Sequence, residues 1–143
     1  MKDCIFCKII KGELPSKTVY EDELIKVIMN INPTTNGHLL VIPKEHVTDF
    51  MEISDELLTH IYKVAREVSN TLMTKLNANA LTLGVNYGDS QVVKHFHLHL
   101  LPNYEIKEAS MKNIDLEQLA GLLNNKMRTI DEAFKEEIEY KEY

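Results

Sequence analysis

The sequence predicts an α+β fold in a single domain, with a mostly antiparallel sheet and two main helices. Short apolar or β-branched runs of strand length come in pairs, and two longer segments carry apolar residues at helical spacing. The order strand, strand, strand, helix, strand, strand, helix is typical of an α+β protein with antiparallel neighbours. The length of 143 residues suits one domain with its own core.

The first three strands are expected before the first main helix. Residues 18–20 and 24–29 are short strand-like runs separated by acidic residues, which is typical of a hairpin. Residues 32–37 form a loop by composition. Residues 38–42 are expected to be a buried strand that ends at Pro43, because proline cannot donate to the hydrogen-bond ladder.

The first main helix is expected to begin at Ser54, a favourable N-cap, followed by Asp55 and Glu56 at the positive end of the helix dipole. Asn77 and Asn79 are expected to end it. Residues at helical spacing give it one apolar face: Leu57, Ile61, Ala65, Val68, Leu72 and Leu76.

Two further strands are expected at residues 80–86 and 95–101, joined by a loop that contains Gly88. Asp115 and Gln118 resemble a capping box at the start of the second main helix. The apolar stripe of that helix contains Leu116, Leu119, Leu123, Met127, Ile130 and Phe134. The acidic residues 136–143 are expected to be a solvated helix end.

Composition excludes several classes of function. The net charge is −6, and residues 131–143 contribute −4 of it through six acids and two lysines. A protein that neutralises nucleic-acid phosphates is usually basic, so no nucleic-acid partner is expected. No apolar run is long enough for a membrane span or a signal peptide, so we expect a cytoplasmic protein without a membrane partner. In a reducing compartment Cys4 and Cys7 are candidates for metal binding or redox chemistry rather than a disulfide.

Three histidines at alternate positions of the last expected strand carry the chemistry. Side chains alternate between the faces of a strand, so His95, His97 and His99 share one face and the apolar residues between them share the other. Clustered titratable groups of this kind mark functional sites. Such histidines can ligate a catalytic metal, or one can be a nucleophile that its neighbours orient. The pattern alone leaves both chemistries open.

The stretch from residue 95 to 101, histidine alternating with apolar residues, resembles the signature of the histidine triad (HIT) family. Residues 4–15 and 36–46 are similar to two further blocks of that family, and so are Asn86, Gly88 and Gln91. The chain is most similar to a small bacterial member of the Hint branch. The resemblance implies a histidine triad domain at residues 1–104 and a C-terminal helical extension at 105–143, packed on the same domain.

The resemblance implies a hydrolase or transferase that acts at the α-phosphorus of a nucleoside phosphoramidate or a related nucleotidyl substrate. His97 would attack phosphorus and form a covalent nucleotidyl-histidine, from which water releases a nucleoside monophosphate. A backbone carbonyl would hold the proton on the other ring nitrogen of His97, and His99 would donate to the phosphoryl oxygens. His38 would orient the triad or relay a proton.

The resemblance also implies a nucleotide site for which a purine is the expected base. Asn86 and Gln91 would hold phosphate oxygens beside His97 and His99. The slot for the base would consist of Phe6, Ile9, Ile28 and Ile31, although Ile9 and Ile28 taken singly could equally be ordinary core. Three departures from the family bear on substrate preference: Asn30 replaces an aspartate that binds the ribose, Val92 replaces a serine, and the 86–91 loop is short. Alternatively, Asn30 only pins the end of its strand.

In several bacterial relatives the cysteine pair joins two histidines in a tetrahedral zinc site. The resemblance therefore implies structural zinc on Cys4, Cys7, His46 and His95, a ligand set that suits the metal. The alternative is two reduced thiols without a partner. Zinc on His95 leaves His97 free, so both sites are compatible.

Two other functions compete with a nucleotidyl hydrolase. One is a nucleotide-binding regulatory protein whose hydrolysis is incidental, and the other is a metal-dependent hydrolase with zinc on all three triad histidines. The relatives are homodimers, and the apolar helix faces offer surface for a dimer here. His60 is expected to be structural or to face solvent.

Overall fold

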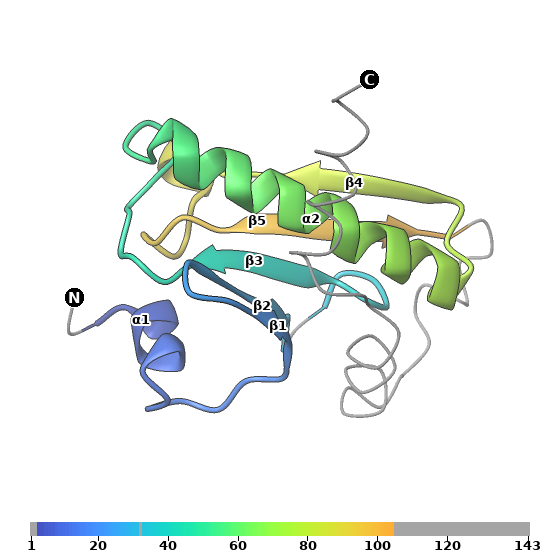
Figure 1. Ribbon diagram of the computed structural model, residues 1–143, viewed down its shortest axis with the longest axis horizontal. Helices are drawn as coiled ribbons and strands as arrows, with labels where there is room; N and C mark the ends of the chain where they lie inside the picture. Colours follow the sequence, from blue (N-terminus) through green and yellow to red (C-terminus); the bar gives the residue numbers. More distant parts are fainter. Residues whose placement is uncertain (1–2, 32, 105–143) are drawn as a thin grey trace, which may run out of the picture.

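Five strands form one sheet in the order β1-β2-β3-β5-β4, and each pair of neighbours is antiparallel (Figure 1). The computed structural model describes residues 3–31 and 33–104. It confirms the predicted α+β class, with a mostly antiparallel sheet in a single domain. The second main helix and the C-terminal extension were predicted for residues outside this described part.

The elements follow the predicted order with small changes in their bounds. The strands are β1 (Thr18–Glu21), β2 (Ile25–Met29), β3 (Leu39–Pro43), β4 (Ala80–Gly84) and β5 (Leu98–Asn103). The helices are α1 (Ile5–Ile10), α2 (Asp55–Leu76) and the 3-10 turn η1 (Gly88–Ser90). Strand β4 stops two residues before the predicted end at residue 86.

The last strand begins at Leu98, whereas the sequence predicted residue 95. The backbone groups just before Leu98 form hydrogen bonds outside the sheet instead of with β3 or β4. The N–H of Phe96 donates to the carbonyl of Val47 at 2.7 Å, and the carbonyl of His95 accepts from the ring of His97 at 2.8 Å. The expected strand is therefore shorter, because its first residues build the site instead of the sheet.

Helix α2 lies across one face of the sheet, where it contacts β3, β4 and β5 (Figure 1). Its bounds agree with the predicted caps. Ser54 Oγ accepts from the N–H of Leu57 at 3.2 Å, and Asn77 ends the helix in the left-handed conformation with φ of 53°. The main core between this helix and the sheet includes Leu57, Ile61, Ala65, Val68, Leu72, Phe96, Leu98 and Leu100.

The opposite face of the sheet carries α1, which the sequence did not predict. Phe6 and Ile9 of this helix pack against Ile28, Leu40 and Ile42 in a second, smaller core. Six residues are too few to show a helical period, and isolated helices of this length are unstable in water. Helix α1 therefore depends on its tertiary contacts.

Gly37 brings the loop before β3 into contact with the end of α2. Its φ is +80°, a conformation that favours glycine. A Cβ atom there would lie 2.4 Å from Leu76 Cδ1 and 2.9 Å from Leu72 Cδ1. Tyr104 holds the same loop, since its hydroxyl donates to the carbonyl of Asn36 at 2.7 Å. Both contacts fix the backbone immediately before His38.

His60 joins α2 to the β1–β2 hairpin, which confirms the structural half of its prediction. Its Nε2 atom lies 2.7 Å from Asp22 Oδ2. The other carboxylate oxygen of Asp22 accepts from the N–H groups of Leu24 and Ile25 in the hairpin turn. One carboxylate thus holds the turn and the helix together.

The edge strand β4 is mostly exposed on both of its faces. Leu83 of this strand and Tyr62 of α2 are large apolar residues with 44% and 42% exposure.

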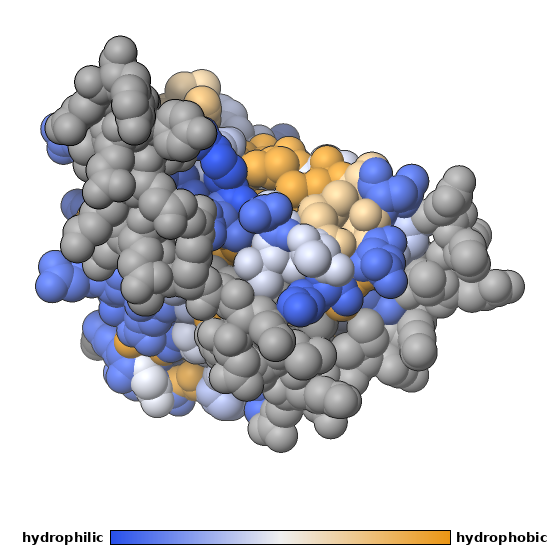
Figure 2. Space-filling view, turned by 45° about the vertical axis from the view of Figure 1, so that its right-hand side comes forward, coloured by the Kyte–Doolittle hydropathy of each residue, from blue (hydrophilic) through white to orange (hydrophobic). Residues whose placement is uncertain are grey.

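On the face shown in Figure 2, apolar residues gather in one area beside hydrophilic ones. In the described part of the chain, no helix has both the length and the apolar character needed to cross a bilayer.

Candidate active site and metal cluster

The predicted histidines come together on the α1 side of the sheet. His99 pairs with Leu40 across β3 and β5, which places both side chains on the face of the second core. Phe6 of α1 contacts the rings of His95 and His97 edge-on, at centroid distances of 5.8 and 5.0 Å. The alternation predicted from the sequence therefore holds, although the hydrogen-bonded strand begins later than expected.

His97 has the orientation that a nucleophilic imidazole needs. It is buried, and its Nδ1 atom donates to the carbonyl of His95 at 2.8 Å. Burial lowers the pKa of His97, and the hydrogen bond to the His95 carbonyl opposes this shift. A neutral His97 with its proton on Nδ1 keeps the lone pair on Nε2 for attack.

A chain of hydrogen bonds determines the tautomer of His99. The N–H of Thr34 donates to His38 Nδ1 at 3.1 Å, so a neutral His38 carries its proton on Nε2. That proton is donated to His99 Nδ1, 2.9 Å away. His99 must then carry its own proton on Nε2, which makes this atom a hydrogen-bond donor.

Burial keeps both histidines of this chain neutral near pH 7. It lowers the pKa of His38 to about 4, with a further contribution from the charges of His99 and His97. It also lowers the pKa of His99, again with a contribution from His97. The rings of His97 and His99 are 4.9 Å apart. The site therefore places a neutral imidazole with a lone pair on Nε2 beside a neutral hydrogen-bond donor.

A cavity of about 330 Å³ adjoins these two histidines, and we call it the nucleotide cavity. It contains most of the residues predicted to bind a nucleotide, namely Phe6, Ile9, Ile28, Asn30, Ile31, Asn86, His97 and His99. Ile9 and Ile28 belong to the second core and also line this cavity, while their contact with a base stays a prediction. Ile31 is 73% exposed and lies at the rim.

Gln91 has a different position from the one predicted. It is buried, it does not line the nucleotide cavity, and its amide nitrogen donates to the carbonyls of Thr48 and Val93 at 2.7 and 3.1 Å. An amide has two N–H groups, and here both have main-chain acceptors. The side-chain amide of Gln91 therefore fixes the loop before the triad and has no N–H group left for the predicted phosphate oxygens.

Asn30 combines the two interpretations given to it. Its backbone N–H donates to the carbonyl of His38 at 3.0 Å, which pins the end of β2 to the start of β3. Its side chain lines the nucleotide cavity, with the amide nitrogen 3.5 Å from His38 Nε2. The backbone of this residue thus pins the strand end, and its side chain faces the space that a ligand would occupy.

The predicted metal ligands also come together. One ligand atom from each of Cys4, Cys7, His46 and His95 lies within 4.8 Å of the others. Cys4 Sγ is 3.3 Å from His95 Nδ1, Cys7 Sγ is 3.2 Å from His46 Nδ1, and the two Nδ1 atoms are 3.2 Å apart. In the part of the chain that the structure describes, this is the only such group of three or more side chains.

This donor set fits zinc. Bonds of about 2.0 to 2.3 Å in a tetrahedron place the donor atoms roughly 3.3 to 3.8 Å apart, close to the distances found here. His95 Nε2 donates to the carbonyl of Pro43 at 2.8 Å, which leaves the lone pair of Nδ1 on the side of the cysteines. The orientation of a metal-binding histidine usually depends on such a second hydrogen bond.

The three triad histidines do not converge on one ion. His95 turns Nδ1 toward Cys4, His97 uses Nδ1 on a carbonyl, and His99 uses Nδ1 on His38. The competing interpretation of a catalytic zinc on all three histidines is therefore wrong for this arrangement. The resemblance implied a backbone carbonyl as the partner of His97, and here that acceptor is the carbonyl of His95. The N–H of Thr34 as the donor to His38 was not expected, because no residue pattern signals it.

This chain is similar to known proteins in both sequence and structure. A HIT domain model matches residues 11–106. An uncharacterized HIT-like protein of Methanocaldococcus jannaschii is 40% identical over 123 residues, which are 81% of this chain and 95% of that one. A Zn-bound histidine triad family protein from Mycobacterium smegmatis has a TM-score of 0.81 and 32% identity, covering 92% of this chain and 98% of that one. A HIT family hydrolase from Clostridium thermocellum has a TM-score of 0.64 and 39% identity, covering 74% and 95%.

Proposed function

Because the chain belongs to the HIT domain family and is related to HIT family hydrolases, we propose that it hydrolyses a nucleotidyl substrate at the α-phosphorus. The reaction passes through a covalent bond to His97. One observation carries this proposal: the 2.8 Å hydrogen bond from His97 Nδ1 to the His95 carbonyl, which leaves Nε2 as the nucleophilic atom. A nucleoside phosphoramidate, with a purine base, is the substrate class that we favour.

The reaction has two steps. The lone pair of His97 Nε2 attacks phosphorus, the P–N bond to the leaving amine breaks, and the amine departs with that electron pair and takes a proton from solvent. Water then attacks the same phosphorus, the bond to Nε2 breaks, and the electron pair returns to the ring. The proton of the water goes to solvent, and the products are a nucleoside monophosphate and an amine.

His99 stabilises the charge that develops on the phosphoryl oxygens, and His38 positions His99. The hydrogen-bond chain from Thr34 leaves His99 Nε2–H as a donor next to the nucleophile. A donor that is already oriented needs no rearrangement as charge develops, which is the condition for transition-state stabilisation. His38 is therefore a positioning residue, and His99 is the group that touches the substrate.

The substitution His97→Asn tests the proposal. We expect a folded protein that binds nucleotide but has lost about three orders of magnitude of turnover or more. Mass spectrometry of the wild-type protein, quenched during turnover of adenosine phosphoramidate, should detect a nucleotidyl adduct on His97. A variant with wild-type turnover would refute the assignment. Binding without turnover in the wild type would instead favour the competing interpretation, a nucleotide-binding regulatory protein.

We further propose that Cys4, Cys7, His46 and His95 hold a structural zinc ion. When bound, the ion would cross-link α1 to the loops beside β3 and β5, and it would take no part in the reaction. The support is the donor set and its spacing, together with the Zn-bound protein from Mycobacterium smegmatis. A chelator should then lower the stability of the protein more than the turnover of each folded molecule.

We also propose a homodimer in the cytoplasm. Strand β4 supports the dimer, because it is an edge strand with exposed residues such as Leu83, and unpaired edges readily join another copy. Light scattering of the purified protein measures the mass directly. A monomer at micromolar concentration would contradict this proposal and leave the chemistry of His97 unaffected.

A further inference from the structure

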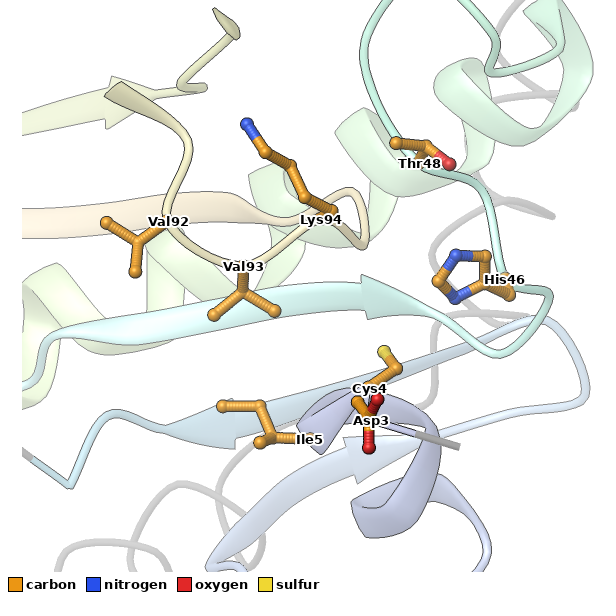
Figure 3. Close-up of a pocket in the computed structure, with 8 residues that line it drawn as sticks. All are labelled: Asp3, Cys4, Ile5, His46, Thr48, Val92, Val93 and Lys94. Carbon is orange, nitrogen blue, oxygen red and sulfur yellow. The ribbon is translucent and has the colours of Figure 1, made fainter. Parts of the chain in front are cut away.

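A second cavity, of about 700 Å³, lies beside the nucleotide cavity. Figure 3 shows that it opens between the start of α1, the segment around residues 46–48 and the loop before the triad. Three residues line both cavities and therefore form the boundary between them: Ile5, Val92 and Val93. The residues that line the second cavity alone are Asp3, Cys4, His46, Thr48 and Lys94, so this cavity also borders two of the side chains of the metal cluster.

The size of the nucleotide cavity leaves part of a substrate unplaced. Its volume of about 330 Å³ is near the lower end of the usual range for small-molecule sites, roughly 300 to 1,000 Å³. Once a base, a sugar and a phosphate occupy it, the group that departs from phosphorus must lie beyond its wall. The adjoining space across Ile5 and Val92 is the second cavity.

The boundary between the two cavities is apolar and exposed. Val92 is 89% exposed and Ile5 is 45% exposed, so neither position is explained by core packing. Exposed apolar side chains that adjoin a cavity favour an apolar ligand, because each methylene removed from water contributes about 0.8 kcal/mol. The boundary therefore suits an alkyl or similarly apolar group.

The boundary residues carry no charge that would favour a compact anion over an apolar group. Among the described residues, Lys94 is the only lysine or arginine that lines either cavity. Its ammonium donates to the carbonyl of Gly88 at 2.9 Å, and in Figure 3 its tip points away from Ile5 and Val93. A departing sulfate or phosphate at this boundary would therefore have one cation near it, Lys94, whose ammonium is directed away from the apolar side chains.

From these observations we infer that the second cavity binds the leaving group of the substrate, and that this leaving group begins with an apolar chain. This inference rests on the proposed function, and it adds a subsite and a substrate class to it. Ile5, Val92 and Val93 contact the part of the leaving group nearest phosphorus. Thr48 lies farther along the cavity.

A series of adenosine phosphoramidates tests the inference. Methylamine, butylamine and hexylamine have nearly equal basicity, so their intrinsic ability to leave is constant and only the chain length varies. We expect kcat/KM to rise by about two- to fourfold for each of the first added methylenes. The His97→Asn protein, which cannot turn over, should show the same trend in calorimetric binding affinity.

A blocking variant and a matched control locate the effect. Thr48→Phe places a ring in the second cavity and should bring the ratio of kcat/KM for hexylamine to that for methylamine close to one. Thr74→Phe makes the same exchange on the exposed surface of α2 and should keep the wild-type ratio. Circular dichroism and thermal melting check that both variants are folded.

The outcomes separate this inference from the proposed function. Turnover of all three substrates with equal kcat/KM in the wild type would overturn the subsite and leave the chemistry of His97 intact. A chain-length effect that survives in Thr48→Phe would also overturn it. Absence of turnover with every substrate would overturn both. If Thr48→Phe does not fold, equal affinity of the three compounds for His97→Asn would refute the inference.

Discussion

Substitution of Gly37 by alanine should destabilise the fold more than the same change at any other described glycine with a positive φ. Two costs add at this position. A non-glycine residue in the left-handed region costs roughly 1 to 2 kcal/mol, and Gly37 has φ of +80°. The new Cβ would also lie 2.4 Å from Leu76 Cδ1 and 2.9 Å from Leu72 Cδ1, and Leu72 is fully buried, so its methyl group can shift only against other core residues. Forcing an extra carbon into such packing costs about 1 to 3 kcal/mol.

Gly12 provides the matched control, because its φ is +82° and no atom lies within 4 Å of the position that a Cβ would take there. Urea unfolding should therefore show a loss of about 1 to 2 kcal/mol for Gly12→Ala and of about 2 to 5 kcal/mol for Gly37→Ala. Because Gly37 precedes His38, only its variant should also slow turnover. Equal losses for the two variants would refute the steric argument and leave backbone strain as the whole effect.

The metal cluster, Asn30 and His38 each lead to a further prediction. Elemental analysis should find about one zinc per chain. Cys4→Ser with Cys7→Ser should lower the melting temperature and leave turnover per folded molecule nearly unchanged. A metal-free protein with the same melting temperature would contradict a structural role for zinc. Asn30→Asp should raise the ratio of ribo to deoxyribo kcat/KM several-fold, because a charged acceptor strengthens the ribose contact by about 1 kcal/mol; an unchanged ratio would limit Asn30 to pinning β2. The folded pKa of His38, about 4, lies below its unfolded value, so stability should be complete above pH 6.5 and fall by up to about 3 kcal/mol as the pH drops to 4. The matched variant is His38→Asn, whose free energy of unfolding in urea should fall less than that of the wild type between pH 6.5 and 4.

Local signals in the sequence were sufficient for most of the fold. Ser54 and Asn77 fixed the ends of α2 because caps act within one turn, and the apolar period of that helix identified its buried face. Helix α1 escaped prediction because six residues carry no period and because its N-cap is Cys4, whose sulfur accepts from Cys7 N–H. Its position depends on contacts with residues far along the chain.

The part of the candidate site that depends only on the direction of side chains along a strand could be predicted. Alternation placed His97 and His99 on one face, and resemblance to a family named the four side chains that the structure brings together in the metal cluster. The contacts made by His38 and Gln91 could not be predicted, because backbone groups of loops supply them. The donor to His38 is the backbone of Thr34, and Gln91 turns away from the nucleotide cavity to bind main-chain carbonyls. Such contacts depend on backbone conformation that residue types do not encode locally.

The acceptor for the nucleophile is a peptide carbonyl, and this has an evolutionary consequence. The carbonyl of His95 orients His97, whereas the imidazole of His95 faces the cysteines. A mutation of residue 95 removes the imidazole and leaves the carbonyl in the chain. A lineage can therefore lose the proposed metal ligands one by one and still inherit the orientation of His97. Selection can act separately on the side chain and on the carbonyl of residue 95.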